Sequence, residues 1–577
     1  MNGGDIIAEV LKKQGVRFLF TLCGGHISPI LVGAKNQGIR IIDVRQESTA
    51  VFAADAISRL TGIPGVAVVT AGPGVTNTIT AIKNAQMAQS PLILLGGAAA
   101  TILKGKGALQ DIEQVKLFKT LVKWAISIEQ DCDIVPILEE AFNIAKSGIP
   151  GPVFVECPID LLYDEELVRH WYGAKTSEPK SLKGKLIKWY VRRHVDKLFA
   201  CDMEKINFSD FKKIVPFKLN ERELQEVLTQ INNAQRPTMV IGSQALLRVE
   251  DADNLAVAVE KIGIPVYLTG MARGLLGENH FLHKLHNRSK ALKESDLVII
   301  AGMPIDFRLD YGRIINRKAF LIIINRSEDY YKKNIKPDLF VQADPSQFLI
   351  ELSKSPIMKN KIWNEWFDIL DKREAKRNEE ILQFSKRKTQ YINPLKLSFE
   401  INKIIDKNSI IVVDGGDFVA TVSYIINPRG PLSWLDAGPF GTLGAGAGFA
   451  LASKLVNPDR EVWLFYGDGA AGYSIVEFDT FVRHKLPIIA VVGNDAGWTQ
   501  IARDQIEYLK DDVGTVLSYN EYHKVVQGFG GDGLLLNNEE QIQSILREAK
   551  KKAVGGTPVL INALIGKTDF RKGSISM

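Results

Sequence analysis

The sequence contains no run of about 18 uninterrupted apolar residues, the length that a membrane-spanning helix needs. Its first residues, Met1 to Asp5, lack the basic stretch and the apolar stretch of a secretory signal peptide. The last four residues, Ser574 to Met577, differ from a peroxisomal signal of the SKL type. We therefore expect neither a membrane-spanning segment nor a recognisable targeting signal in this sequence.

Cysteine is scarce, with four residues among 577. None of the four, Cys23, Cys132, Cys157 and Cys201, forms a CxxC pair or has the spacing of a zinc site. Three of them lie in or beside apolar runs and are predicted to be small core residues. We therefore expect a protein that belongs to a reducing compartment or does not depend on disulfides.

The sequence also lacks a strong charge imbalance, because its formal net charge of +6 is small for its length. Hydrophobic residues make up 46% and charged residues 24%, which is the composition of an ordinary globular protein. At roughly 100–200 residues per domain, the length predicts three domains. The mild positive charge suits anionic small molecules or a membrane surface, and it does not indicate nucleic-acid binding.

Short β-branched runs alternate with amphipathic segments in three parts of the chain. The runs are apolar on both faces, as the buried strands of parallel sheets are. We predict an α/β protein with three doubly wound parallel-sheet domains, at residues 1–165, 221–352 and 395–577. The predicted strands are 16–20, 41–44, 65–70, 91–95, 237–242, 265–269, 297–302, 321–325, 410–414, 462–466, 488–493 and 559–564. In both the first and the third domain, a strand leads through a glycine-rich turn into a helix of small residues.

Two charged segments separate the three domains. Residues 353–394 contain a helix-forming stretch that we expect to be a solvated connector with little core of its own. Residues 166–220 form a basic linker, in which the cations between 175 and 197 alternate with apolar residues such as Leu186 and Trp189 at roughly helical spacing. A basic amphipathic helix can lie in a membrane interface. It can also pack on its own protein with its basic face in water, as most amphipathic helices do.

Two short motifs in the third domain indicate a metal-bound diphosphate. Gly467-Asp468-Gly469 and Asn494-Asp495-Ala496-Gly497 each follow a predicted strand, and 27 residues separate Asp468 from Asp495. A carboxylate at one strand end and a second oxygen ligand one βαβ unit later can hold one hard divalent cation. A glycine turn that opens a helix beside this cation forms a diphosphate site. The alternative is a pair of unrelated turns, because short glycine motifs alone are weak evidence.

A glycine-rich run, Gly441-Thr442-Leu443-Gly444-Ala445-Gly446-Ala447-Gly448, opens a helix one strand before Asp468. Glycine allows backbone N–H groups to come close to phosphate oxygens, and a helix N-terminus adds about half a positive charge. The same glycines could instead serve only close helix packing. Their position in front of Asp468 favours the phosphate role.

Glu47 is a further candidate, because it follows an apolar strand and precedes a predicted helix at 48–60. Ligands of α/β folds bind at the carboxyl ends of such strands. In an apolar pocket the proton affinity of a carboxylate rises, which suits proton exchange with a neutral heterocycle. A surface glutamate that only caps the next helix is the alternative.

These motifs resemble the thiamine-diphosphate-dependent family of acetolactate synthases and oxalyl-CoA or 2-hydroxyacyl-CoA lyases, over nearly the full length. The spacing from the Gly-Asp-Gly motif to Asn494-Asp495 matches the thiamine diphosphate (ThDP) motif of that family, and Ala71-Gly72-Pro73-Gly74 with Asn77 resembles its glycine–proline turn. The 2-hydroxyacyl-CoA lyases resemble the chain most. Long matching stretches are 70–90, 271–276, 493–500 and 566–571.

The resemblance implies ThDP and Mg²⁺ as cofactors. Asp468, Asp495 and the Gly497 carbonyl are expected to hold the metal, with Asn494 kept as an alternative ligand, and Gly441, Gly467 and Gly469 are expected beside the cofactor. Leu443 stands where relatives place the apolar wedge that bends the cofactor. Glu47 stands where relatives carry the glutamate that activates the cofactor ring. Family members place each cofactor between two subunits, which implies a homodimer or a homotetramer.

The chain departs from the family in two places. Many relatives have histidine where this chain has Gln46, and glutamine can donate a hydrogen bond but cannot carry a proton charge. The usual Asn-Asn pair is Asn494-Asp495 here. An aspartate ligand adds a negative charge and is expected to bind Mg²⁺ more tightly.

The resemblance favours cleavage of a 2-hydroxyacyl-CoA into formyl-CoA and a shortened aldehyde. Arg273, within the motif at 271–276, is a candidate for binding CoA phosphates, together with Arg308 and Arg326, although exposed arginine is common. Two alternatives remain: condensation of 2-oxoacids, as in acetolactate synthases, and a silent member that acts as a binding subunit. Relatives belong to the endoplasmic reticulum membrane and carry an N-terminal anchor. This sequence begins at about the first helix of the domain and shows no such anchor, so we expect either a truncated start or a soluble or peripheral protein.

Overall fold

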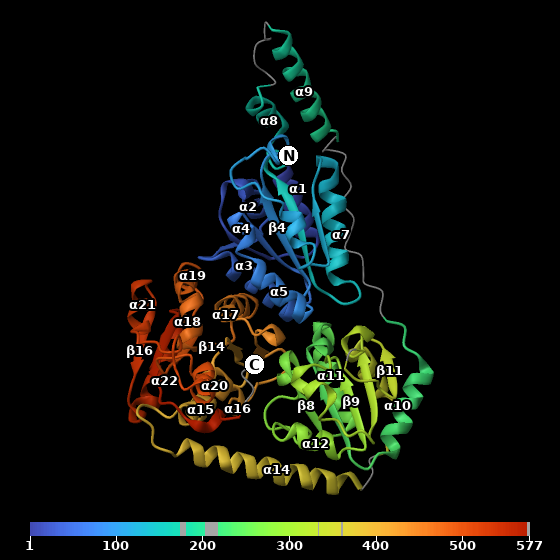
Figure 1. The fold of residues 1–577 in the computed structure, drawn as a ribbon, viewed down its shortest axis with the longest axis vertical. Coiled ribbons are helices and arrows are strands. Elements are labelled where there is room, and N and C mark those ends of the chain that lie inside the picture. Colours follow the sequence, from blue (N-terminus) through green and yellow to red (C-terminus); the bar gives the residue numbers. More distant parts are fainter. Residues whose placement is uncertain (174–180, 202–216, 333, 359–361, 574–577) are drawn as a thin grey trace. The chain divides into compact units, whose positions relative to one another are not determined.

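The computed structural model describes residues 1–173, 181–201, 217–332, 334–358 and 362–573, which form two compact units, 1–215 and 216–577. In each unit, helices cover parallel β-sheet (Figure 1). Residues 174–180, which belong to the predicted basic linker, and Ser574 to Met577 lie outside the described residues. Among the described residues, no helix is both long enough and apolar enough to cross a bilayer.

The first unit is built on a six-stranded parallel sheet with the strand order β2-β1-β3-β4-β6-β5. The strands are β1 (Phe18–Leu22), β2 (Arg40–Asp43), β3 (Gly65–Val69), β4 (Leu92–Ala98), β5 (Trp124–Ser127) and β6 (Pro152–Pro158). The helices are α1 (Gly3–Lys13), α2 (Ser28–Asn36), α3 (Glu47–Thr61), α4 (Pro73–Thr76), α5 (Ile79–Ala88), α6 (Gln114–Phe118), α7 (Ile134–Lys146), α8 (Glu165–Trp171) and α9 (Leu182–Leu198). Every residue of β3, β4 and β6 is buried, because helices cover both faces of the sheet.

The second unit contains two parallel sheets, ordered β11-β10-β9-β7-β8 and β13-β12-β14-β15-β17-β16. The first consists of β7 (Pro237–Ile241), β8 (Val266–Leu268), β9 (Leu297–Ala301), β10 (Phe320–Asn325) and β11 (Leu339–Gln342). The second consists of β12 (Ile410–Val413), β13 (Trp434–Leu435), β14 (Val462–Gly467), β15 (Ile489–Asn494), β16 (Asp532–Leu536) and β17 (Val559–Leu564). The prediction of three parallel-sheet α/β domains is therefore confirmed.

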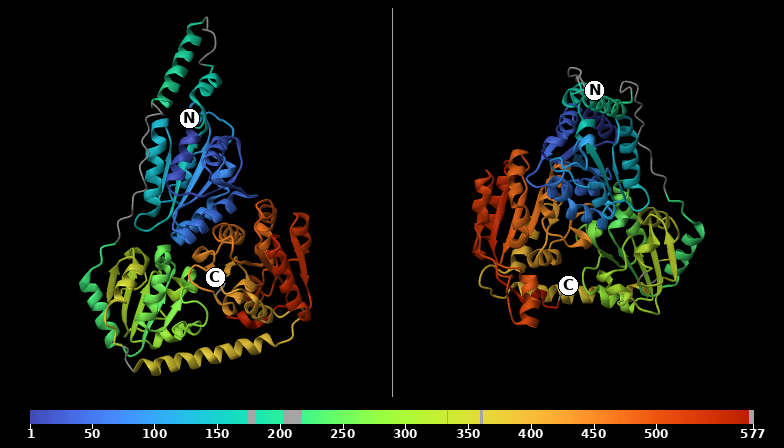
Figure 2. Two further views of the ribbon diagram at one scale, coloured as in Figure 1. Left: turned by 180° about the vertical axis from the view of Figure 1, so that it is seen from behind. Right: turned by 45° about the horizontal axis from the view of Figure 1, so that its top comes forward.

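The helices of the second unit lie on the faces of these two sheets (Figure 2). They are α10 (Glu221–Asn233), α11 (Ala252–Ile262), α12 (Arg288–Glu294), α13 (Pro345–Leu352), α14 (Ile362–Ser385), α15 (Pro394–Ile404), α16 (Asp417–Ile425), α17 (Ala445–Val456), α18 (Asp468–Ser474), α19 (Phe478–Arg483), α20 (Thr499–Leu509), α21 (Tyr522–Gly528) and α22 (Ile542–Val554).

The first and the last sheet share one topology. If each is numbered from its own first strand, both have the order 2-1-3-4-6-5. The chain reverses its direction of travel across the sheet beside the first strand, and α/β proteins bind ligands at the carboxyl strand ends next to such a reversal. The similar local organisation predicted for these two parts of the sequence thus has a structural basis.

The segment before the third sheet is more buried than the sequence suggested. Helix α14 buries Trp363, Trp366 and Leu370, and Trp366 and Leu370 belong to the core around β9 and β10. The Trp366 indole N–H donates to the Pro237 carbonyl at 3.1 Å. The expectation of a solvated connector with little core is wrong, because Trp363, Trp366 and Leu370 recur at helical spacing and are buried along one face of the helix.

The cysteines also differ from the prediction. Cys132 and Cys201 form a disulfide that closes a loop of 69 residues, whereas Cys157 is buried in the core of the first unit and Cys23 is exposed. The prediction of three core cysteines is therefore wrong, because Cys157 is the one that is buried, and the disulfide speaks against the expected independence of disulfides. Two cysteines so far apart in sequence have no local pattern that would predict their pairing.

Candidate active site

Glu47 is the first residue of α3, at the carboxyl end of β2. Its side chain is buried, with 7% exposed, and one of its carboxylate oxygens accepts a hydrogen bond of 3.0 Å from the Asn77 amide. Asn77 follows α4 in the turn after β3, so two strand ends bring these predicted residues together. The amide fixes the orientation of the carboxylate, which is what a proton-handling group needs.

The turn between β3 and α4 runs close to this carboxylate. Gly72 has a φ of +61°, in the region that favours glycine, and its N–H donates to the Gln114 side chain at 2.9 Å. A Cβ atom at Gly74 would lie 2.8 Å from Thr70 and 3.7 Å from a Glu47 oxygen. Gly72, Pro73 and Gly74 thus form one wall beside Glu47. Gln114, which holds this wall from a distant helix, was not among the predicted residues.

Asp468 is the first residue of α18, directly after β14. Its carboxylate is almost fully buried and accepts backbone hydrogen bonds from Gly469 at 2.9 Å and from Gly497 at 3.0 Å. The bond to Gly497 joins the two sequence motifs. Burial raises the pKa of Asp468 to about 6, against the effect of the backbone donors.

Asp495 and Asn494 have different surroundings. The Asn494 amide donates to the Asn520 carbonyl and to the Asn562 side chain, each at 3.2 Å, so this side chain serves the local fold. Asp495 lines a cavity together with Asp468. Burial, and secondly the neighbouring charge of Asp468, raise the pKa of Asp495 to about 7, and Thr499 and Lys567 act in the opposite direction.

The glycine-rich run at the start of α17 is capped by an aspartate that was not predicted. Asp414, at the end of β12, accepts backbone hydrogen bonds from Gly444 at 2.9 Å and from Gly446 at 2.7 Å. These two N–H groups are therefore engaged within the protein. Burial raises the pKa of Asp414 to about 7. The phosphate role of this run stays a prediction, and the Gly444 and Gly446 N–H groups already have a partner in Asp414.

Leu443 and Gly441 lie in those first residues, and both line the cavity. The Leu443 side chain packs against Gly415, where an added Cβ would lie 2.3 Å from a Leu443 methyl carbon. Gly415 must therefore lack a side chain for Leu443 to take this position. The leucine thus stands between the β12 and β14 strand ends as a fixed apolar protrusion.

The cavity has a volume of about 560 Å³ and lies at the carboxyl ends of β12, β14 and β15. It brings together most of the residues predicted for the diphosphate end of the site. Those that line it are Gly441, Leu443, Gly467, Asp468, Gly469, Asp495 and Gly497, along with Arg273 and Arg308. A volume of this size suits a cofactor with room for a substrate group.

The three predicted CoA-binding arginines have different environments. Arg273 lies 4.2 Å from the ring centre of Trp434 and donates to the Ser423 carbonyl, while it faces the cavity. Arg308 also lines the cavity and forms a two-point ion pair with Asp306, at 3.0 and 2.7 Å. Arg326 instead forms a buried ion pair with Asp344. Arg326 therefore has a structural role next to the N-terminus of α13.

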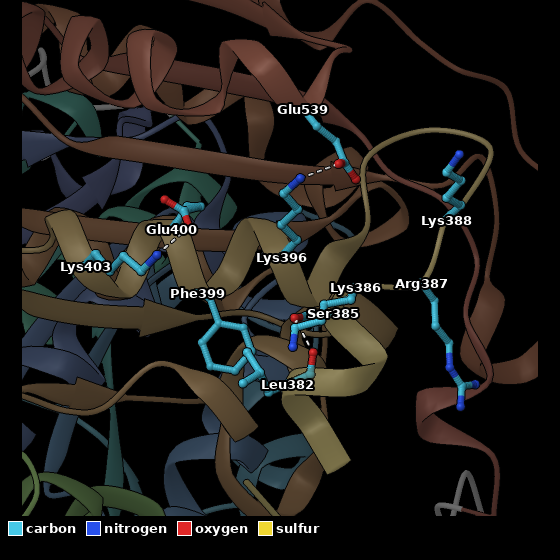
Figure 3. Close-up of a pocket in the computed structure, with 10 residues that line it drawn as sticks. All are labelled: Leu382, Ser385, Lys386, Arg387, Lys388, Lys396, Phe399, Glu400, Lys403 and Glu539. Atoms are coloured by element: carbon cyan, nitrogen blue, oxygen red, sulfur yellow. Dashed lines mark hydrogen bonds and ion pairs between the residues drawn. The ribbon is translucent and has the colours of Figure 1, made fainter. Parts of the chain in front are cut away.

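Another cavity, of about 440 Å³, lies between the end of α14 and α15 (Figure 3). None of the predicted site residues lines it. Two of its cations already have acidic partners, because Lys396 pairs with Glu539 and Lys403 pairs with Glu400 at 2.6 Å. The first cavity is therefore the better candidate for chemistry.

The donor set at the first cavity suits a hard divalent cation. Asp468 and Asp495 are two buried carboxylates that repel each other, and a cation between them would offset that repulsion. Tyr522, a further residue that was not predicted, donates to the Asp468 backbone carbonyl at 3.1 Å and stabilises this strand end. The arrangement can hold a diphosphate through a metal and leave the rest of the cavity for a substrate.

Doubly wound sheets bind ligands at the carboxyl ends of their strands, and the buried acidic residues at these ends place the chain among the α/β proteins that bind a ligand there. Three family models match the chain. They describe the thiamine pyrophosphate enzyme N-terminal TPP binding domain over residues 1–117, the central domain over 224–352 and the C-terminal TPP binding domain over 414–563. The chain belongs to the thiamine pyrophosphate enzyme family, and its cofactor is thiamine diphosphate.

Curated relatives match over the full length. The chain is 48% identical to 2-hydroxyacyl-CoA lyase 2 of Danio rerio and 49% identical to that of Homo sapiens, covering 100% of this chain and 93% and 92% of those proteins. It is 32% identical to a probable acetolactate synthase of Mycobacterium bovis, covering 98% of this chain and 96% of that protein. Both groups that the sequence motifs indicated are thus confirmed as relatives.

Proposed function

We propose that the chain is a ThDP- and Mg²⁺-dependent carbon–carbon lyase that cleaves a 2-hydroxyacyl-CoA into formyl-CoA and an aldehyde shortened by one carbon. The observation that carries this proposal is the full-length identity of 48–49% to proteins named as such lyases, against 32% to a probable acetolactate synthase. In the reaction, the bond between C1 and C2 breaks. The 2-hydroxyl loses its proton as the aldehyde forms, and the C1 carbon receives a proton as formyl-CoA is released.

Thiamine diphosphate supplies an electron sink at its thiazolium ring when it is bound. We assign the activation of the cofactor to Glu47, whose carboxylate would hydrogen-bond the pyrimidine ring. Asn77 holds that carboxylate in place. Leu443 would press against the cofactor between its two rings, and the walls of the cavity would exclude water from the reacting carbons.

Magnesium would be held by the side chains of Asp468 and Asp495 and by the Gly497 carbonyl. Support comes from the position of both carboxylates on the cavity and from the hydrogen bond that ties Gly497 to Asp468. Asp495 is favoured over Asn494 as the second ligand, because Asp495 lines the cavity whereas the fully buried Asn494 does not, and the Asn494 side-chain oxygen accepts from the Ala496 N–H. Arg273 and Arg308 remain candidates for the CoA phosphates, because both face the cavity.

The proposal includes a homodimer or homotetramer. Phe440, before α17, and Tyr473 and Val476, at and beyond the end of α18, are exposed apolar side chains that another subunit would cover. It also includes peripheral contact with a membrane, which suits a substrate with a fatty acyl chain. The contact would involve the basic segment that contains α9.

An assay of the purified, ThDP- and Mg²⁺-loaded protein separates the candidates. Release of formyl-CoA and a shortened aldehyde from 2-hydroxyacyl-CoA supports the lyase. Formation of acetolactate from pyruvate, without formyl-CoA release, would instead support the condensing enzyme that the 32% identical relatives suggest. A protein that binds ThDP and Mg²⁺ but converts neither substrate would support a non-catalytic binding subunit.

A further inference from the structure

Helix α9 turns apolar side chains toward water instead of toward its own protein. Leu182, Leu186 and Trp189 are 82%, 66% and 57% exposed, and at 100° per residue they lie within about 60° of one another on the helix. Tyr190 is also exposed and lies beside them. A monomeric protein rarely leaves so continuous an apolar stripe in water, so the stripe requires a partner.

The same outward face carries a cluster of cations. Lys183, Lys185, Arg192, Arg193 and Lys197 are exposed, and Asp196 is the one acidic residue of the helix. Arg193 stacks over the Trp189 ring at 5.4 Å, so cation and aromatic ring share one position. Aromatic rings and basic side chains together are typical of surfaces that lie at the level of lipid headgroups.

The opposite face fixes α9 to the first unit. Val195 and Leu198 are buried, and Leu198 belongs to the core that contains β1 and α7. His194 bonds Thr101 at 2.8 Å. On the outward side, the exposed Asp196 also ties α9 to α8 through an ion pair with Arg169 at 2.6 Å. Figures 1 and 2 show α8 and α9 as a helical pair at one end of this unit. The outward stripe is therefore a fixed feature of the fold.

We infer that α9 is a docking helix that lies in the surface of an anionic membrane, with its Leu182–Leu186–Trp189 stripe among the acyl chains and its cations against the headgroups. This rests on the membrane contact of the proposed function and deepens it by assigning a surface and a lipid class. Helices at a membrane interface are held there by the burial of apolar side chains and by the attraction of their cations to anionic lipid.

The charge of α9 favours an anionic membrane over a second copy of the chain as the partner of the apolar stripe. Two α9 helices face to face would bring together five exposed cations and one carboxylate from each helix, which is strongly unfavourable at short distance. A bilayer that contains anionic lipid has acyl chains that can receive the apolar stripe and, above them, negatively charged headgroups that can pair with the cations. The long side chains of lysine and arginine can then reach the headgroups while their stems lie along the apolar layer.

Vesicle flotation tests the inference with the full-length protein and without substrate, so its outcome is independent of lyase activity. We compare vesicles of phosphatidylcholine with vesicles that also contain phosphatidylserine. The wild-type protein is expected to float at least about tenfold more with the anionic vesicles, as interfacial basic helices do. Leu186→Glu/Trp189→Glu is expected to abolish flotation. Val554→Glu, at an exposed apolar position of α22, is the matched control and should float like wild type.

Charge reversal tests the electrostatic part. Lys183→Glu/Lys185→Glu should lose the preference for anionic vesicles, whereas Arg547→Glu/Lys551→Glu on α22 should retain it. Unchanged thermal unfolding of each variant shows that it is folded. Equal flotation of wild type and Leu186→Glu/Trp189→Glu would overturn the inference. Absence of flotation in the wild type would overturn it too. If the wild type does not float but self-associates, and Leu186→Glu/Trp189→Glu abolishes that self-association, the stripe binds a second copy of the chain instead of a membrane.

Discussion

Glu47 is the residue whose chemistry the proposed reaction needs most. It is buried at a strand end and oriented by the Asn77 amide at 3.0 Å. We expect Glu47→Gln to lower turnover by about 100-fold to 10,000-fold, the usual contribution of a positioned acid or base, and to leave ThDP binding intact. Steady-state kinetics and titration calorimetry measure the two effects.

Asn77→Ala should produce a smaller loss, because it frees the carboxylate without removing it. Glu129→Gln, at an exposed glutamate of the same unit, is the control. Wild-type turnover in Glu47→Gln would remove Glu47 from the mechanism.

Asp468 and Asp495 predict a pH-dependent metal site. Burial raises the pKa of the two carboxyl groups to about 6 and about 7, so protons compete with the metal near neutral pH. The affinity for Mg²⁺ is expected to fall as the pH is lowered from about 8 to about 5. Calorimetric titration of Mg²⁺ in the presence of ThDP measures this dependence.

Asp495→Asn should bind Mg²⁺ at least about tenfold more weakly, because it removes a ligand charge. A pH-independent affinity, or an unaltered variant, would contradict the assignment.

Asp414 predicts a pH dependence of stability. Burial raises its folded-state pKa from 3.8 to about 7, so the folded protein holds a proton that the unfolded chain releases between these values. The contribution of this group therefore falls as the pH rises through that window, by roughly 4 kcal/mol at most, and is constant above it. The variant Asp414→Asn has no ionisable group at this position, so its stability lacks this pH-dependent contribution.

The difference in Tm between Asp414→Asn and wild type should therefore move in favour of the variant as the pH rises from about 4 to about 8. A difference that stays constant across this range would contradict the burial of an ionisable carboxyl group at this position. Scanning calorimetry at several pH values gives the comparison.

At the scale of elements, the disulfide ties the chain just after α9 to the turn that precedes α7. Closing a loop of 69 residues is worth about 4 kcal/mol in the chain-entropy model. Cys132→Ser/Cys201→Ser is expected to lower the Tm, and reductant should lower the wild-type Tm without affecting the double variant. Alkylation of the unfolded, unreduced protein should label only Cys23 and Cys157. Labelling of all four cysteines would show that the bond is absent.

Most central strands were predictable from sequence and most edge strands were not, although the predicted ranges 41–44 and 265–269 overlap the edge strands β2 and β8. The strand β17 matches its predicted range, 559–564, because a parallel strand buried on both faces is a continuous apolar run. The edge strands β5, β11, β13 and β16 were missed. β5, β11 and β16 are partly exposed and β13 has only two residues, so none shows that pattern. The central strand β6 was missed too, although it is fully buried.

The site was predictable where function concentrates in short motifs. Glu47 stands at a strand end of the first sheet, whereas Asp468 and Asp495 follow β14 and β15, two adjacent parallel strands that bring these aspartates together. Asp414 and Gln114 act through backbone N–H groups far away in sequence, and no local pattern reports such bonds. Arg326 was predicted from the sequence to bind a phosphate, but in the fold it forms an ion pair with Asp344, which no local sequence pattern indicates.

At the scale of the whole molecule, the first and the last sheet repeat one strand order and each presents acidic residues at its carboxyl ends. This arrangement matches the two TPP binding domains of the family, one at residues 1–117 and the other at 414–563. The boundaries of the five segments, 1–165, 166–220, 221–352, 353–394 and 395–577, remain a prediction. Truncation at these positions followed by limited proteolysis would test them.

Carbon–carbon cleavage is the central claim, and product analysis tests it most directly. Incubation of the ThDP- and Mg²⁺-loaded protein with 2-hydroxyacyl-CoA of several chain lengths, followed by mass spectrometry, should show formyl-CoA and an aldehyde one carbon shorter in equal amounts. Both should depend on Glu47. Intact 2-hydroxyacyl-CoA at every chain length, in a protein that demonstrably holds ThDP and Mg²⁺, would contradict the account.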